Sequence, residues 1–248
     1  MIAFFAMLFF IAINRDFYYT PILLIPSAAF AISYAVATFG AVLAISYGSL
    51  AKSSLIISFS LLIPSLYGIL FLKEPTSPTL WIGTALLIAS FTLINYEKGA
   101  FSQKSSWKWY VFVFLAFFGN GMCSTVQKAK QEYTPLGDNL FMIVALAMVA
   151  VLMFVAALLT KQDRPKIRAT VRHGAWSALL CGVANGLTNL LVIHLNHKLP
   201  ASTLFPVISG GSVILSFLYS VFVIREKFNA RQTLGFFLGV VSIILLNL

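Results

Sequence analysis

Residues 138–160 read DNLFMIVALAMVAVLMFVAALLT and give the strongest indication of the fold class. After Asp138 and Asn139, residues 140–159 carry no charged or polar side chain. A helix needs about 20 such residues to cross the hydrocarbon core of a bilayer, because each residue advances it by about 1.5 Å. An apolar run of this length therefore predicts a helix that spans a membrane.

Seven further runs have similar length and composition. The eight predicted spans are 21–47, 53–72, 79–96, 107–127, 138–160, 174–196, 201–224 and 232–248. They are continuously apolar, whereas the strands of membrane barrels alternate polar with apolar side chains. Residues 1–13 form a ninth run, which we expect to be a short or truncated span rather than a signal peptide, since no basic stretch precedes it. The sequence thus predicts an all-α polytopic membrane bundle of about nine transmembrane helices.

The composition of the whole chain favours a lipid environment. Of the 248 residues, 60% are hydrophobic and 10% are charged, and the mean hydropathy is +0.92. A soluble core cannot bury so much apolar side chain, so the lipid bilayer is the expected surrounding. We expect an integral membrane protein, located in the plasma membrane of a bacterium.

The formal net charge of +10 has an explanation in the loops. Its Lys and Arg side chains lie in short gaps between apolar runs, where cations hold loops in the cytoplasm and meet anionic lipid. We therefore expect no nucleic-acid partner. Alternate gaps hold 12 and five of these side chains, and the positive-inside rule then predicts a cytoplasmic N-terminus and an external C-terminus.

The chain also matches itself at an offset of 152 residues. Matched residues are Lys73-Glu74 with Arg225-Glu226, Gly83 with Gly235, and Asn95 with Asn247. Five predicted spans separate Glu74 from Glu226, and an odd number of spans turns the second copy upside down relative to the first. Inverted repeats of this kind are common in secondary transporters.

Two segments resemble the EamA-type repeat of the drug/metabolite transporter superfamily. One runs from Pro200-Ala-Ser-Thr-Leu-Phe-Pro-Val-Ile-Ser-Gly-Gly to Arg225-Glu226-Lys227 and through Gln232-Thr-Leu-Gly-Phe-Phe-Leu-Gly239; the other is Ser46 to Asn95. The resemblance implies a first repeat over residues 1–98 that lacks its first helix, an inter-repeat loop over 99–106 and a second repeat over 107–248. It implies a secondary transporter of small metabolites, amino-acid-like or related solutes, that works by alternating access, with efflux as the expected direction.

Polar side chains inside the spans are the candidates for a substrate pathway, because they are costly in lipid and face the bundle interior. These candidates are Tyr34, Thr38, Ser58, Asn120, Asn185, Asn189 and Ser209. Asn185 and Asn189 lie one helical turn apart and share a face, and Tyr34 and Thr38 occupy roughly corresponding positions in the first copy. Each candidate has a structural alternative, in which the amide or hydroxyl only bonds a neighbouring helix or carbonyl.

Pro64 and Pro206 are candidate hinges. Each removes a helical hydrogen bond inside lipid, and the freed carbonyl can bind a ligand or allow a bend, although membrane helices also carry proline without such a role. Glu74 and Glu226 precede predicted helix starts, so we expect each to stabilise the positive end of a helix rather than to carry protons.

The sequence shows no catalytic motif and no metal-ligand spacing, so we expect no enzyme, no metal and no cofactor. Gly235 and Gly239 suit close helix contact, either within the chain or across a homodimer interface. The alternative to a transporter is a membrane scaffold or regulatory subunit of the same fold. A transporter is expected to have a central polar cavity lined from both halves, whereas a scaffold is expected to fill that space with side chains.

Overall fold

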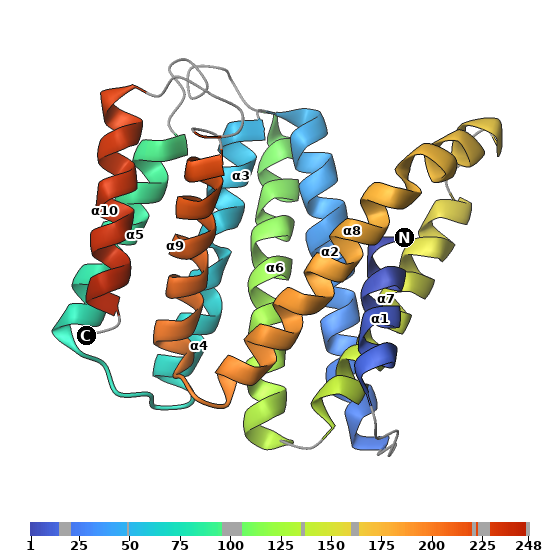
Figure 1. Cartoon of the computed structure of the whole chain (residues 1–248), viewed down its shortest axis with the longest axis horizontal. Helices are drawn as coiled ribbons and strands as arrows, with labels where there is room; N and C mark the ends of the chain where they lie inside the picture. The colour runs from blue at the N-terminus through green and yellow to red at the C-terminus, as the bar shows by residue number, and fades with distance from the viewer. Residues whose placement is uncertain are drawn as a thin grey trace. The chain divides into compact units, whose positions relative to one another are not determined.

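The computed structural model describes residues 1–14, 21–48, 50–95, 106–134, 137–159, 164–219, 222 and 229–246, and most of these residues are helical (Figure 1). The α-helices are α1 (Ile2–Ile13), α2 (Leu24–Tyr47), α3 (Leu50–Ser58), α4 (Leu62–Leu70), α5 (Pro78–Asn95), α6 (Trp107–Tyr133), α7 (Asp138–Leu159), α8 (Arg164–Asn196), α9 (Ala201–Tyr219) and α10 (Ala230–Leu246). The 3-10 helix η1 (Pro21–Leu23) precedes α2, and η2 (Phe59–Leu61) joins α3 to α4. No strand occurs in these ranges, which confirms the all-α prediction. Most of the predicted inter-repeat loop, with Glu226 and Asn247, lies outside the described residues.

Each predicted apolar run corresponds to one helical segment, with α3, η2 and α4 sharing a run. Among the described residues, four helices are long and apolar enough to cross a membrane: Pro21–Tyr47, Trp107–Tyr133, Asp138–Leu158 and Gly174–Asn196. Shorter apolar helices are Ile2–Ile13, Ile56–Leu70, Pro78–Ile94 and Ala230–Leu246. Helix α6 runs past the predicted end at residue 127, because its polar last turns contain no helix breaker.

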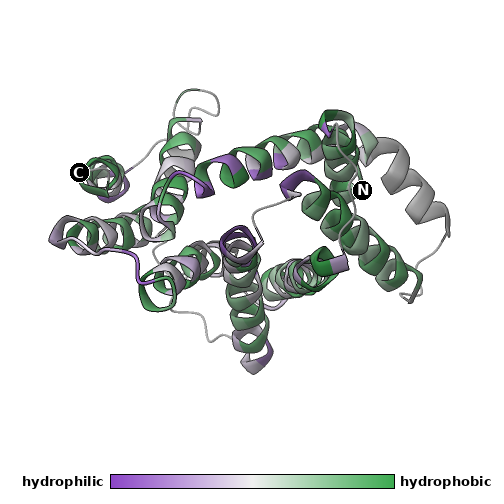
Figure 2. Ribbon diagram, turned by 90° about the horizontal axis from the view of Figure 1, so that it is seen from below, coloured by the Kyte–Doolittle hydropathy of each residue, from purple (hydrophilic) through white to green (hydrophobic). Residues whose placement is uncertain are grey.

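Most of the helical ribbon carries the colour of hydrophobic residues (Figure 2). Ile25 is 78% exposed, Leu70 68% and Phe154 65%, all within apolar helices. Exposing such apolar side chains to water is unfavourable, whereas exposing them to the hydrocarbon of lipid is not. The protein is therefore an integral membrane protein of helical type.

The helices form two compact units. Unit 1 comprises Met1–Ala35 and Val126–Lys198, and unit 2 comprises Val36–Thr125 and Leu199–Leu248. Both units contain segments of both predicted repeats, and the repeat boundaries stay a prediction. In unit 1, helix α1 packs on α7 and α8. A Cβ added at Gly182 would lie 2.5 Å from Cβ of Phe5, so this glycine permits the close approach of α1 to α8.

In unit 2, α5 and α10 form a reciprocal pair (Figure 1). The Ser90 hydroxyl donates to the Gly235 carbonyl at 2.7 Å, and the Ser242 hydroxyl donates to the Gly83 carbonyl at 2.7 Å. Both the two serines and the two glycines differ by the offset of 152, and the crossed pattern makes the helices antiparallel. This is the symmetry that an inverted duplication produces, and it supports the predicted repeat.

Glu74 links the α4–α5 connection to the start of α9 within unit 2. Its carboxylate oxygens accept hydrogen bonds from the amides of Ala201 at 2.7 Å and Ser202 at 2.9 Å. A Cβ at Gly68 would lie 2.4 Å from Oε2 of Glu74, so only glycine leaves room for the carboxylate there. The prediction that Glu74 stabilises a helix N-terminus is confirmed, but the helix is α9 rather than the following α5.

Candidate functional site

A break between α3 and α4 positions the first side chains of a cavity in unit 2. Pro64 lacks an amide hydrogen and its ring crowds the carbonyl of Ser60, so the chain cannot form a regular α-helix through this region. It passes instead through the 3-10 turn η2. This irregular turn brings Ser58 and Leu61 to the same cavity.

The cavity has a volume of about 220 Å³. Its walls come from α3, η2, α5, α6 and α9, and the lining residues are Ile57, Ser58, Leu61, Phe91, Asn120, Ser209 and Ser212. Four of these carry hydroxyl or amide groups. The cavity thus brings together Ser58, Asn120 and Ser209, three of the residues that the sequence predicts for a pathway.

Ser209 is the most unusual member of this lining. It is 4% exposed, and its hydroxyl has no hydrogen-bond partner among the described residues. A buried hydroxyl left without a partner costs roughly 1–3 kcal/mol, so such groups in proteins normally meet water or a ligand. The hydroxyl of Ser209 therefore marks a place where a polar atom of another molecule would be stabilised.

The other polar groups of the lining make hydrogen bonds within unit 2. Asn120 donates from Nδ2 to Oγ of Ser60 at 2.6 Å, which ties α6 to η2. Ser58 donates to the carbonyl of Ser54 at 2.8 Å, and Ser212 donates to the carbonyl of Ser209 at 2.9 Å. These bonds orient the side chains while leaving acceptor capacity on the hydroxyl of Ser58 and the amide oxygen of Asn120.

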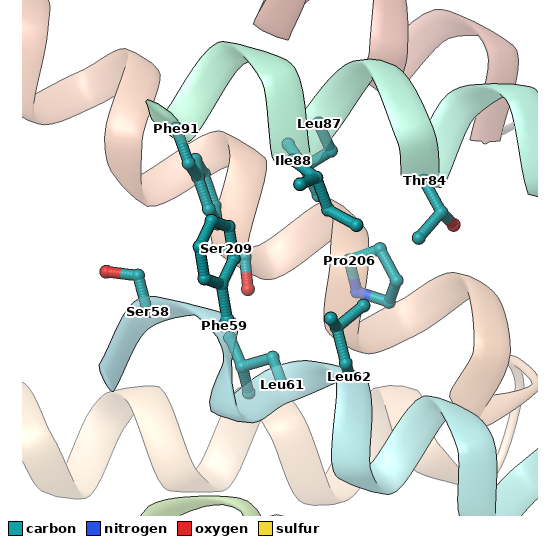
Figure 3. Close-up of a pocket in the computed structure, with 10 residues that line it drawn as sticks. All are labelled: Ser58, Phe59, Leu61, Leu62, Thr84, Leu87, Ile88, Phe91, Pro206 and Ser209. Carbon is teal, nitrogen blue, oxygen red and sulfur yellow. The ribbon is translucent and has the colours of Figure 1, made fainter. Parts of the chain in front are cut away.

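Beside the cavity lies a mostly apolar slot of about 10 Å³, room for roughly one water molecule, whose lining residues are drawn in Figure 3. The slot shares Ser58, Leu61, Phe91 and Ser209 with the cavity, and the rings of Phe59 and Phe91 lie 5.8 Å apart in its wall. Pro206, the predicted hinge inside α9, also lines the slot. The other predicted hinge, Pro64, is buried in α4.

Unit 1 holds a second group of polar side chains, between α6 and α8. Gln127 donates from Nε2 to Oδ1 of Asn189 at 2.9 Å, and Asn189 donates from Nδ2 to the carbonyl of Asn185 at 2.9 Å. The predicted pair Asn185 and Asn189 is thus bonded within the unit, which favours its structural alternative. Tyr34 also belongs to unit 1, where its ring centroid lies 6.1 Å from that of Phe30. Thr38 belongs to unit 2 but does not line its cavity.

The end of α6 contains buried polar residues that sequence reasoning missed. Lys130 has a side chain with 0% exposure that forms an ion pair with Asp138, whose other oxygen lies 2.6 Å from Nε2 of His197. Gln131 donates to the carbonyl of Ile193 at 2.8 Å. The sequence signal that could have revealed these residues is the absence of a helix breaker just after residue 127.

Across the described part of the chain, no group of three or more His, Cys, Asp or Glu side chains is placed to hold a metal ion.

Comparison with known proteins places the chain in a family. A crystal structure described only as that of a protein matches with a TM-score of 0.68 and 15% identity, over 100% of this chain and 97% of the other. At that identity the likeness shows the fold alone. No curated protein matches the sequence at a significant level. The model of the EamA-like transporter family matches residues 102–248, which is more than half of the sequence. The chain therefore belongs to the EamA-like transporter family, within the drug/metabolite transporter superfamily.

Proposed function

We propose that this membrane transporter moves small metabolites by alternating access and that the solute binds in the cavity of unit 2. The observation that carries the proposal is Ser209, which lines the cavity and whose buried hydroxyl has no hydrogen-bond partner among the described residues. A solute that meets this hydroxyl would replace the hydrogen bond that water otherwise supplies. Embedded polar groups of this kind commonly mark a solute pathway in membrane proteins.

The origin of the lining supports transport over a scaffold function. Ser58 and Phe91 come from the predicted first repeat, whereas Asn120, Ser209 and Ser212 come from the predicted second repeat. Because the site is built from both repeats, any movement of one repeat against the other changes its shape. A scaffold would gain packing energy by filling such a space with side chains.

Pro64 and Pro206 are the proposed bending points. Pro64 follows the 3-10 turn that positions Ser58, and Pro206 lies inside α9 one turn before Ser209. A bend at either proline would move a cavity wall without breaking a regular helix elsewhere, because the helical hydrogen bond is already missing there. We assign Asn185 and Asn189 to helix packing, since their amides bond within unit 1.

Transport by purified protein in liposomes tests the proposal. A panel of metabolites would be assayed for uptake and release against a gradient of each sign, so that efflux and influx are both read. We expect at least one solute to move, and we expect Ser209→Leu to reduce its transport about tenfold or more because the side chain fills the cavity and removes the hydroxyl.

Thr92→Leu is the matched control. Thr92 is exposed on α5 and donates only to the Ile88 carbonyl of its own helix, at 2.8 Å. This variant should transport like the parent protein, and both variants should unfold at the parental temperature. Absence of transport for every solute, or full transport by folded Ser209→Leu, would refute the proposal.

A further inference from the structure

The cavity of unit 2 has a lining that is polar but uncharged. All the described residues that line it are neutral: Ile57, Ser58, Leu61, Phe91, Asn120, Ser209 and Ser212. The walls of the adjoining slot, which include Thr84 and Pro206, are neutral as well. A charged group that enters such a space leaves water without gaining an ion partner, and this is costly in a medium of low dielectric constant.

The hydrogen-bonding capacity of the lining indicates which neutral groups would be stabilised. Ser209 offers both a donor and an acceptor, because its hydroxyl has no partner among the described residues. Asn120 uses its amino group toward Ser60 and keeps a carbonyl oxygen as an acceptor. Ser58 uses its hydrogen toward Ser54 and keeps its oxygen as an acceptor. Acceptors outnumber donors here, so a matching solute presents several N–H or O–H groups.

The volume of the cavity limits the size of that solute. An engineered cavity of about 150 Å³ accommodates benzene, which has six heavy atoms. By proportion, the 220 Å³ of this cavity corresponds to about nine non-hydrogen atoms. The phenyl ring of Phe91 supplies an apolar wall for the carbon skeleton of the solute.

We infer that the cavity selects short, uncharged solutes rich in hydrogen-bond donors, such as small polyols or primary amides, over carboxylates, amines and zwitterions. This inference rests on the proposed function, and it names the substrate class of the same site. It also revises the expectation of amino-acid-like solutes, because both ends of an amino acid are charged at neutral pH and each would need a counter-charge.

Four molecules of nearly the same shape separate charge from size. Lactamide is neutral, lactate is an anion, alaninamide is a cation and alanine is a zwitterion. Their effect on the unfolding temperature of the detergent-solubilised protein reports binding, since a ligand of the folded state raises it. We expect lactamide to stabilise the protein and the three charged molecules to require about tenfold higher concentration or more for the same shift. When the four molecules compete with the transported solute in liposomes, lactamide should inhibit transport at the lowest concentration.

A second experiment adds a negative charge to the cavity lining in order to change which solute the protein prefers. Asn120→Asp places a carboxylate of nearly equal size in the lining, and the hydroxyl of Ser60 can donate to it. This variant should favour alaninamide over lactamide about tenfold relative to the parent protein. Ser77→Asp is the matched control, because Ser77 is exposed just before α5, so this variant adds the same charge away from the cavity and should leave the preference unchanged. If Asn120→Asp does not fold, Ser58→Asp tests the same point.

The outcomes distinguish the inference from the function on which it rests. If the metabolite panel contains transported or stabilising solutes but these are charged, the inference is wrong and transport stands. Unchanged solute preference in both folded aspartate variants would also overturn the inference. If no solute of any charge moves or stabilises the protein, the proposed function itself fails.

Discussion

The contact between α2 and α6 in unit 2 gives a quantitative prediction about Gly40. A Cβ added there would lie 2.6 Å from the backbone nitrogen of Ala116 and 2.9 Å from the carbonyl oxygen of Phe112. Carbon atoms in contact prefer separations of about 3.5 Å or more, so Gly40→Ala must move the two helices apart by roughly 1 Å. Both obstacles are backbone atoms, and no change of side-chain rotamer relieves the clash.

The expected cost follows from this geometry. Overpacking costs about 1–3 kcal/mol, and the better helix propensity of alanine returns up to about 1 kcal/mol. Gly174→Ala is the matched control, because nothing lies within 4 Å of a Cβ at that helical position and only the propensity gain applies. The two variants should therefore differ by about 1–3 kcal/mol in the free energy of unfolding. For a chain of this length that corresponds to roughly 2–12 °C in unfolding temperature.

Thermal unfolding of the purified variants in one detergent measures this difference. The shift of α6 should also weaken the hydrogen bond from Asn120 to Ser60, so solute binding should fall in Gly40→Ala and not in Gly174→Ala. Equal unfolding temperatures for the two variants would show that the close approach of α2 and α6 has been misread.

Three further predictions concern other contacts. Ser90→Ala and Ser242→Ala should each lower the free energy of unfolding by about 1 kcal/mol and should be additive, as denaturation of the single and double variants can establish. Glu74→Ala should lower the free energy of unfolding by about 1–2 kcal/mol and speed amide hydrogen exchange in the first turn of α9. Glu74→Gln should lie between this variant and the parent protein in both measurements. Unchanged exchange would argue against the capping role. Asp138→Asn should cost about 3–5 kcal/mol because it leaves the buried ammonium of Lys130 without its carboxylate. Adding Lys130→Met to that variant should recover most of the loss in unfolding temperature, and no recovery would contradict the ion-pair assignment.

The helices could be predicted from the sequence because each apolar run is long enough to need lipid. The end of α6 could not, since residues 128–133 have the polarity of a loop. Only the folded structure shows that Lys128 and Lys130 are buried there, where Lys128 donates to the carbonyl of Asn196 at 3.1 Å. Burial of a polar side chain depends on a partner from another helix, and a single sequence does not identify that partner.

The candidate site was predictable in part. Ser58, Asn120 and Ser209 stand out as polar residues in apolar runs, and the structure brings them to one cavity. Ser60 and Ser212 have the same sequence signal as many packing serines. The arrangement of η2 and α9 decides that Ser60 holds Asn120 and that Ser212 lines the cavity. Asn185 and Asn189 show the opposite case, because a conspicuous pair of amides forms hydrogen bonds within unit 1 instead.

The reciprocal bonds of α5 and α10 also bear on biosynthesis. Ser90 and Ser242 bond to residues 145 and 159 positions away, so these hydrogen bonds of α5 form only after α10 has been synthesised. Until then the Ser90 hydroxyl and the Gly83 carbonyl lack the hydrogen bonds that α10 supplies. A chain released before Ala230 is made therefore leaves the Ser90 hydroxyl of α5 without its acceptor on Gly235, at a cost of roughly 1–3 kcal/mol if it stays buried.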